Sequence, residues 1–224
     1  MRNLIKLFSA LLVISFAFSC EKNSDDPNPD IDNGSKDNVS TVDVFNPILG
    51  TVSGTSTLTR TDTGITVNYK STGLNPGYAY TLWWVIWNSP GECLTPNGCG
   101  DPEDVDFFNP ATEVDLLYAT GLVVGNNGEG NFLAHLNAGD DSESENELME
   151  LPVVGGLHIG NVFNAEVHLV LRSHGPVIAD MVVEQIGGYI GGCTDPFAFL
   201  PFSEIPDEVG ECGDIEFAVH PPVK

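Results

Sequence analysis

Alternating apolar and polar side chains recur along the chain from about residue 42 onward, and they indicate strands rather than helices. Residues 65–70 alternate strictly, which is typical of a half-buried strand. Residues 78–87 are apolar on both faces, as expected for a strand at the centre of a sheet. Further strands are predicted at residues 116–124, 131–136, 165–174 and 215–220.

Glycine and proline separate these predicted strands. Residues 125–130 contain Gly and Asn that tolerate positive φ, so the strands at 116–124 and 131–136 are expected to form a hairpin. Several short strands with turn signals between them predict an all-β domain over residues 42–224. An antiparallel β-sandwich is the first expectation and a β-barrel is the alternative.

The N-terminus has the order of an export signal. Two basic residues precede an apolar run at residues 7–18, which is too short to span a bilayer because spanning takes about 20 apolar residues. The sequence Ala-Phe-Ser-Cys that ends at Cys20 resembles the lipobox of bacterial lipoproteins, in the looser form of the Bacteroidota. The resemblance implies that residues 1–19 are removed and that Cys20 is lipidated and anchors the chain to a membrane.

Residues 20–41 are expected to form a disordered acidic tether, because they are polar and proline-bearing and lack apolar periodicity. The Ser-Asp-Asp run at residues 24–26 resembles the surface-export signal of Bacteroidota lipoproteins, and a plain solvated linker is the alternative. We therefore expect a cell-envelope protein, lipid-anchored in the outer membrane. Its domain then faces the periplasm or the cell surface.

Charge excludes one class of partner. The chain has 8 Lys and Arg against 32 Asp and Glu, a formal net charge of −24. Such a chain repels nucleic acid and anionic lipid head groups, so no nucleic-acid partner is expected.

Four cysteines remain once Cys20 is set aside, and an even number in an exported chain indicates disulfides. The pairing Cys93–Cys99 and Cys193–Cys212 is favoured, because each pair encloses a loop rich in Gly and Pro. A zinc site built from the four thiols is the alternative, which the lack of any Cys-x-x-Cys spacing disfavours.

The predicted strand at residues 165–174 carries the main candidate site. Alternation places four polar side chains on the face opposite its apolar core face: Glu166, His168, Arg172 and His174. Three interpretations are open. The histidines bind a divalent transition metal, the face binds an anionic or sugar-like ligand, or it is solvated and forms ion pairs. Residues six apart on a strand lie roughly 20 Å from each other, so one ion cannot bridge both histidines.

Aromatic residues gather in the predicted strand at residues 78–87. Trp83 and Trp87 share one face, and Tyr80 and Trp84 share the other. One set must face the core. The other set forms either a covered second face or a platform for a sugar ring, with Trp83 or Trp84 as its centre.

Acidic residues in loops give a second candidate site. Four carboxylates follow Cys99 and are candidate calcium ligands: Asp101, Glu103, Asp104 and Asp106. Their spacing does not match the EF-hand loop. The acidic run at residues 140–145 is expected to be a mobile solvated loop instead.

These observations leave three functional hypotheses. The first is a displayed binding module for a small polar ligand, a glycan or a protein partner, which needs no cofactor. The second is a metal-dependent hydrolase that uses His168 and His174, and the third is a structural surface protein. No nucleophile elbow, phosphate loop or dinucleotide motif is present. The domain also resembles exported bacterial proteins with a Trp-Trp strand and a Val-His-Leu-Val-Leu-Arg-Ser-His-Gly-Pro strand, a resemblance that implies no particular activity.

Overall fold

The computed structural model describes residues 38–94, 98–100, 104, 109–195 and 206–223. All of them belong to the second of two units, Ser35–Lys224. The expected signal peptide, Cys20 and most of the tether therefore lie outside the described residues. Across the ranges that are described, no helix is both long enough and apolar enough to cross a membrane.

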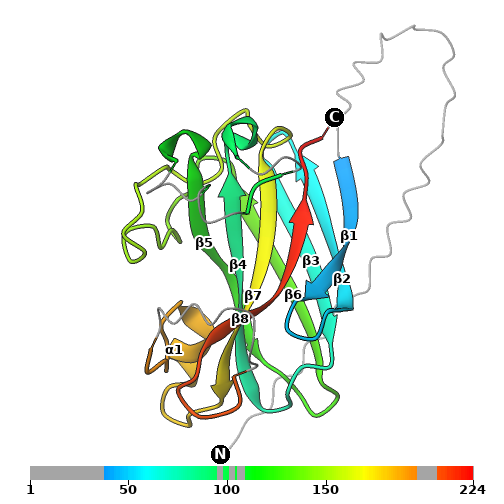
Figure 1. Ribbon diagram of the computed structural model, residues 1–224, viewed down its shortest axis with the longest axis vertical. Coiled ribbons are helices and arrows are strands. Elements are labelled where there is room, and N and C mark those ends of the chain that lie inside the picture. The colour runs from blue at the N-terminus through cyan, green and yellow to red at the C-terminus, as the bar shows by residue number, and fades with distance from the viewer. Residues whose placement is uncertain (1–37, 95–97, 101–103, 105–108, 196–205, 224) are drawn as a thin grey trace, which may run out of the picture. The chain divides into compact units, whose positions relative to one another are not determined.

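The described chain forms one eight-stranded antiparallel sheet (Figure 1). Its strands are β1 (Asn38–Asn46), β2 (Thr51–Thr61), β3 (Gly64–Thr72), β4 (Tyr78–Trp87), β5 (Val114–Val123), β6 (Glu129–Asn137), β7 (Glu166–Pro176) and β8 (Gly213–His220). The spatial order is β5-β4-β7-β8-β1-β2-β3-β6. The helical elements are short: η1 (Pro90–Glu92), η3 (Pro110–Thr112) and α1 (Val182–Gly187).

The sheet curls upon itself, so that β5, β4, β7 and β8 face β1, β2, β3 and β6 across a single core. Trp84 and Leu169 enter this core from the first half, and Leu58 and Phe132 enter it from the second. Burial of each such side chain contributes about 1.5–3 kcal/mol to the stability of the fold. The all-β antiparallel prediction is confirmed, and the nearly closed sheet is compatible with both a sandwich and a barrel.

Most of the strands lie where the alternation predicts them. β6 alternates strictly between exposed and buried residues, whereas β4 and β7 are buried on both faces because other segments cover their second face. The strand pair β1 and β2 was not predicted, because its many Thr and Ser residues hide the pattern. β1 begins at Asn38, inside the stretch that the sequence assigns to the tether.

The predicted hairpin around residues 125–130 is wrong. β5 pairs with β4 and β6 pairs with β3, so the two strands lie at the opposite ends of the strand order. The Gly- and Asn-rich turn instead carries the chain from one edge of the sheet to the other, where β5 and β6 approach without a ladder between them. Turn chemistry alone cannot distinguish these two connections.

Residues 143–146 line the free edge of β5, where the sequence predicts a mobile acidic loop. The backbone N–H of Tyr118 donates to Glu143, and that of Glu145 donates to Leu116. Asn146 is fully buried and its side chain also accepts from Leu116 N–H and donates to the Val114 carbonyl. The edge groups of β5 at residues 114, 116 and 118 are thereby satisfied, which protects this part of the edge from pairing with another chain.

Candidate binding cleft

The second face of β7 carries the four polar residues singled out in the sequence, and it is buried. Glu166 is 3 % exposed, His168 9 %, Arg172 1 % and His174 0 %. Val167, Leu169 and Leu171 point into the core on the other face, as the alternation predicts. The face is therefore not solvated, because the segments around Cys99 and Tyr189 fold over it. The ion pair with a neighbouring strand that the same interpretation expects is present, between Arg172 and Asp214 of β8.

Both predicted disulfides are present, and each one belongs to a segment that covers this face. Cys93 is bonded to Cys99, and Cys193 is bonded to Cys212. The local pairing is confirmed, so the four thiols do not form a zinc site. The first disulfide lies in the connection between β4 and β5, and the second lies between α1 and β8.

At one end of the face, Glu166 holds the first of these segments. Its Oε1 accepts hydrogen bonds from His168 Nε2 at 2.7 Å and from the Cys99 backbone N–H at 2.8 Å. A carboxylate only accepts, so Nε2 carries the hydrogen. Gly98 has a φ of +141°, and a Cβ there would lie 3.1 Å from Glu166 Oε1. Glycine therefore permits the loop to approach the carboxylate this closely.

Arg172 holds the second segment near the other end. Its Nη1 donates to Asp214 Oδ1 at 2.9 Å and to the Tyr189 hydroxyl at 3.2 Å, and its Nε donates to the Tyr189 carbonyl at 3.1 Å. The guanidinium also lies 4.0 Å over the Tyr189 ring, which is a cation–π contact. Burial, and then the charge of Asp214, raise the pKa of the Tyr189 hydroxyl.

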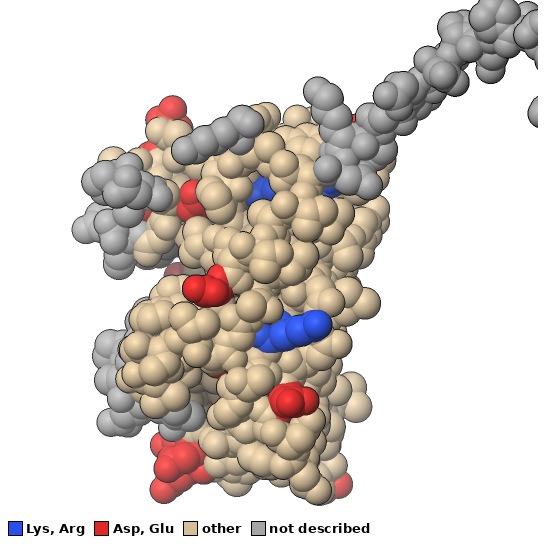
Figure 2. All heavy atoms as spheres, turned by 90° about the vertical axis from the view of Figure 1, so that its right-hand side faces the viewer, with Lys and Arg blue, Asp and Glu red and all other residues tan. Residues whose placement is uncertain are grey.

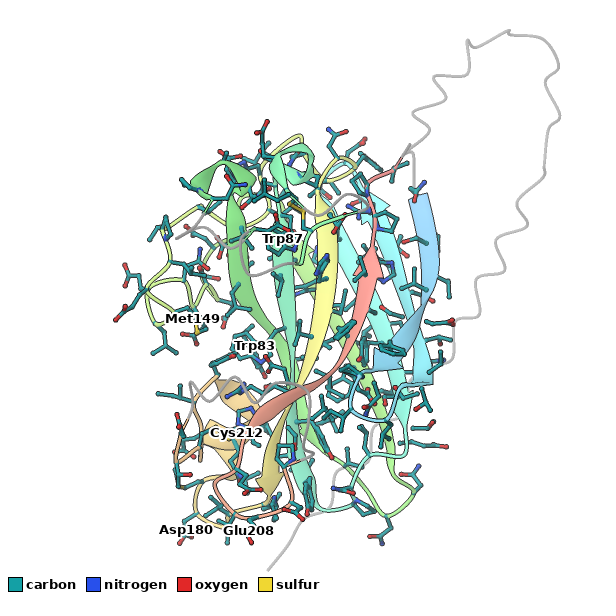
Figure 3. All side chains as sticks on the ribbon, in the orientation of Figure 1. Trp83, Trp87, Met149, Asp180, Glu208 and Cys212 are labelled. Carbon is teal, nitrogen blue, oxygen red and sulfur yellow. A yellow bond between two sulfur atoms is a disulfide. The ribbon has the colours of Figure 1, made fainter. Side chains whose placement is uncertain are left out.

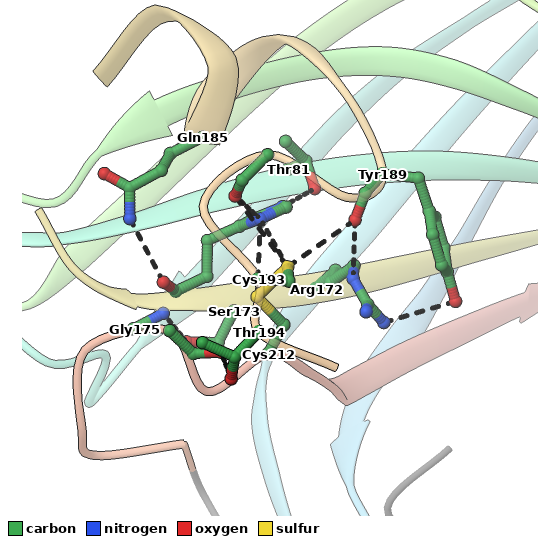
Figure 4. The surroundings of a disulfide bond; sticks show 12 residues. Thr81, Arg172, Ser173, Gly175, Gln185, Tyr189, Cys193, Thr194 and Cys212 are labelled. Carbon is green, nitrogen blue, oxygen red and sulfur yellow. Dashed lines mark hydrogen bonds between the residues drawn. A yellow bond between two sulfur atoms is a disulfide. The ribbon is translucent and has the colours of Figure 1, made fainter. Parts of the chain in front are cut away.

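His174 belongs to a linear chain of hydrogen bonds beside the disulfide Cys193–Cys212, and Figure 4 labels Thr81 of this chain together with both cysteines. Trp83 Nε1 donates to Thr81 Oγ1 at 2.7 Å, Thr81 Oγ1 lies 2.8 Å from His174 Nε2, and His174 Nδ1 lies 2.9 Å from the Gly191 carbonyl. Because the carbonyl only accepts, Nδ1 carries the hydrogen and Nε2 accepts from Thr81. Burial, and then the charge of Arg172, lower the pKa of His174 to about 4, so the imidazole is neutral near pH 7.

The two histidines of the metal hypothesis do not meet. His168 bonds to Glu166 at one end of β7, and both ring nitrogens of His174 are engaged at the other. His174 Nδ1 and the sulfurs of Cys193 and Cys212 lie within 4.8 Å of one another, yet the sulfurs are joined in a disulfide and are not thiolate ligands.

Only one of the candidate calcium ligands lies in the described residues. Asp101, Glu103 and Asp106 lie outside them. Asp104 is fully buried, and its carboxylate accepts from the backbone N–H groups of Leu94 and Gly100. Asp104 thus ties the loop of the first disulfide together.

An apolar cleft of about 160 Å³ lies on this face between the two ends. It is lined by Trp83, Val85, Trp87, Val114, Leu116, Met149, Leu151, Val170, Tyr189 and Asp214. Figure 3 shows Trp83 and Trp87 on β4, with Met149 on the flank of the molecule beside them. An apolar cleft of this size can hold a benzene-sized molecule, since apolar cavities of about 150 Å³ engineered into protein cores bind benzene.

The polar groups at the cleft are few. Asp214 is paired with Arg172 at one side. Trp87 is 3 % exposed, and its Nε1 has no hydrogen-bond partner among the described residues. Trp84 faces the core, whereas Trp83 lines the cleft. The ring of Trp83 makes edge-to-face contacts with Tyr118 and Tyr189, with distances between ring centroids of 5.5 and 5.2 Å.

Several lining residues were missed in the sequence. Met149, Leu151 and Tyr189 come from connections without periodic pattern, so no signal placed them beside the sheet. Trp87 was already placed on the face of Trp83 in the sequence, and Val170 could have been found because it alternates onto the same face as Arg172.

Charged residues do not form a patch on the face drawn in Figure 2, where scattered acidic and basic side chains interrupt a mainly neutral surface. The net charge of −24 therefore gives no charged site on that face. No protein-family model matches the chain, and the searches of curated proteins and of solved structures found no match either.

Proposed function

We propose that the chain is an exported, lipid-anchored binding module of the bacterial cell envelope, which holds a small apolar group in the cleft beside Trp83 and Trp87. The observation that carries the proposal is the cleft itself. An open apolar hollow on an otherwise covered sheet face is the kind of site in which small ligands bind.

The lining selects an apolar ligand over a sugar. Trp83 is fully buried and enclosed by two tyrosine rings, so its faces are not available as a stacking platform. Val85, Val170 and Leu151 offer no hydrogen bonds to hydroxyl groups. An aromatic ring or a short alkyl chain of roughly six to ten heavy atoms fits the volume. Such ligands bind with Kd values of roughly 0.1–10 mM.

The walls of the cleft are held in place before a ligand arrives. Asn146 ties the segment of Met149 and Leu151 to β5 through its bonds to Val114 and Pro152. Arg172 ties Tyr189 to the sheet. Preorganised walls reduce the ordering cost of binding.

Export and anchoring are proposed from the N-terminal sequence, and the two disulfides support an oxidising compartment. The lipid on Cys20 then holds the module at the outer membrane. Cys20→Ser is expected to abolish labelling by a radioactive fatty acid and to release the chain from membrane fractions. Unchanged labelling would reject the anchor.

The ligand proposal is tested by titrating toluene and indole into the exported, oxidised chain and following ligand-observed NMR. Val170→Phe fills the cleft and is expected to weaken binding at least tenfold. Leu133→Phe is the matched control, because Leu133 is 65 % exposed on β6 in the other half of the sheet. Equal binding by the parent and Val170→Phe would show that the cleft is not the site.

A further inference from the structure

A second hollow of about 160 Å³ opens between the connection that follows β1 and the turn that follows β3. It is lined by Asn46, Leu49, Thr51, Val52, Ser53, Thr72, Gly73, Leu74, Asn75, Tyr80, Ile215 and Glu216. None of these residues belongs to the cleft of the proposed function. The two hollows are therefore independent sites.

Glu216 is the unusual residue of this pocket. It is 1 % exposed, and no Lys or Arg is among the described residues that line the pocket. Its Oε2 accepts a hydrogen bond from the Tyr69 hydroxyl at 3.3 Å, and none of the ion pairs in the described part of the chain includes it. A buried carboxylate without a cationic partner is costly, so such groups are rare unless something compensates them.

Other polar side chains surround this carboxyl group. Asn46 and Ser53 line the pocket and interact with it, and Ser71 lies beside it. The Ser71 hydroxyl is buried against the same carboxyl group. Burial raises the pKa of Glu216, and the hydrogen bonds from these neighbours oppose that rise. The carboxyl group is thus held by neutral hydroxyl and amide donors, and no Lys or Arg among the described residues of the pocket balances its charge.

We propose that this pocket binds a primary alkylammonium group, with the ammonium at Glu216 and the alkyl chain toward the solvent. An ammonium has three donors and no acceptor, and its positive charge complements a carboxylate that has only neutral hydrogen-bond partners in the pocket. Leu49, Val52 and Leu74 provide an apolar wall for the methylene groups. The excess of acidic residues favours the approach of a cation.

The test titrates n-butylammonium chloride into the full chain with both disulfides formed, and follows backbone amide shifts by NMR. Glu216→Gln keeps the shape and removes the charge, and it is expected to weaken binding at least tenfold. Asp43→Asn is the matched control, since Asp43 is exposed on β1 and its substitution removes the same charge. Neutral n-butanol is expected to bind at least tenfold more weakly than butylammonium to the parent.

Leu49→Trp is a second variant for the case in which Glu216→Gln does not fold, because Leu49 is 60 % exposed at the rim and its replacement narrows the entrance. It is expected to weaken butylammonium binding at least fivefold. Equal affinity of the parent and either pocket variant for butylammonium would overturn the proposal, as would equal affinity of the parent for butanol. Val170→Phe alters only the other cleft and is expected to leave butylammonium binding unchanged. Each of the two proposals can therefore be refuted without refuting the other.

Discussion

Arg172 is predicted to be the residue that holds the segment of Tyr189 against the sheet. Arg172→Met keeps the apolar volume of the stem and removes, among the described residues, two hydrogen bonds to Tyr189 and one to Asp214. Tyr189 is 4 % exposed, so its carbonyl and hydroxyl lose a donor in a dry environment, at about 1–3 kcal/mol for each group. Removing the buried guanidinium recovers part of this through its own desolvation cost. We expect a net loss of about 2–4 kcal/mol in the free energy of unfolding.

Urea denaturation followed by tryptophan fluorescence measures this loss, because Trp83 contacts Tyr189 and reports on the same segment. Asp214→Asn is expected to cost less, about 1 kcal/mol, since the Asp214 side chain is 22 % exposed and stays partly hydrated. The double variant then gives the coupling energy between the two charges. A loss below about 1 kcal/mol for Arg172→Met would refute the placement of Arg172 in a buried network.

Three further measurements test the framework around the cleft. Replacing Cys193 and Cys212 by Ser is expected to cost roughly 3 kcal/mol, against roughly 2 kcal/mol for Cys93 and Cys99, since their sequence separations are 19 and 6; a reversed order in urea denaturation would contradict the loop-entropy argument. His174 has a pKa lowered from 6.5 to about 4, so stability falls as pH falls from 6.5 toward 4, by up to roughly 3 kcal/mol. His174→Gln should therefore reduce the dependence of stability on pH in that window, and an unchanged slope would argue against a buried neutral imidazole. Saturating toluene should raise the melting temperature of the parent and not that of Val170→Phe, as differential scanning calorimetry would show.

Sequence alternation predicts the central strands of this fold well and the connectivity poorly. β4 matches its predicted bounds of 78–87, because an uninterrupted apolar run with a Gly-rich turn before it has few alternative structures. The turn at residues 125–130 misled the prediction, since Gly and Asn permit a tight hairpin and a crossing between edges equally. β2 was missed because Thr and Ser alternate with few large apolar residues, and its inner face buries Arg60 and Ser56.

The prediction of the candidate site was likewise correct for the strand residues and incomplete for the connecting segments. Alternation correctly placed Glu166, His168, Arg172 and His174 on one face, and the structure adds the segments that cover it. Each of these polar side chains bonds to a covering segment or to a neighbour that does so. Their hydrogen-bonding groups are therefore engaged in holding the covering segments against the sheet. The space left between the anchored ends is lined by valine, leucine and aromatic side chains. In this protein the polar residues that draw attention in the sequence thus build the walls, and the apolar residues between them form the surface on which a ligand is expected to bind.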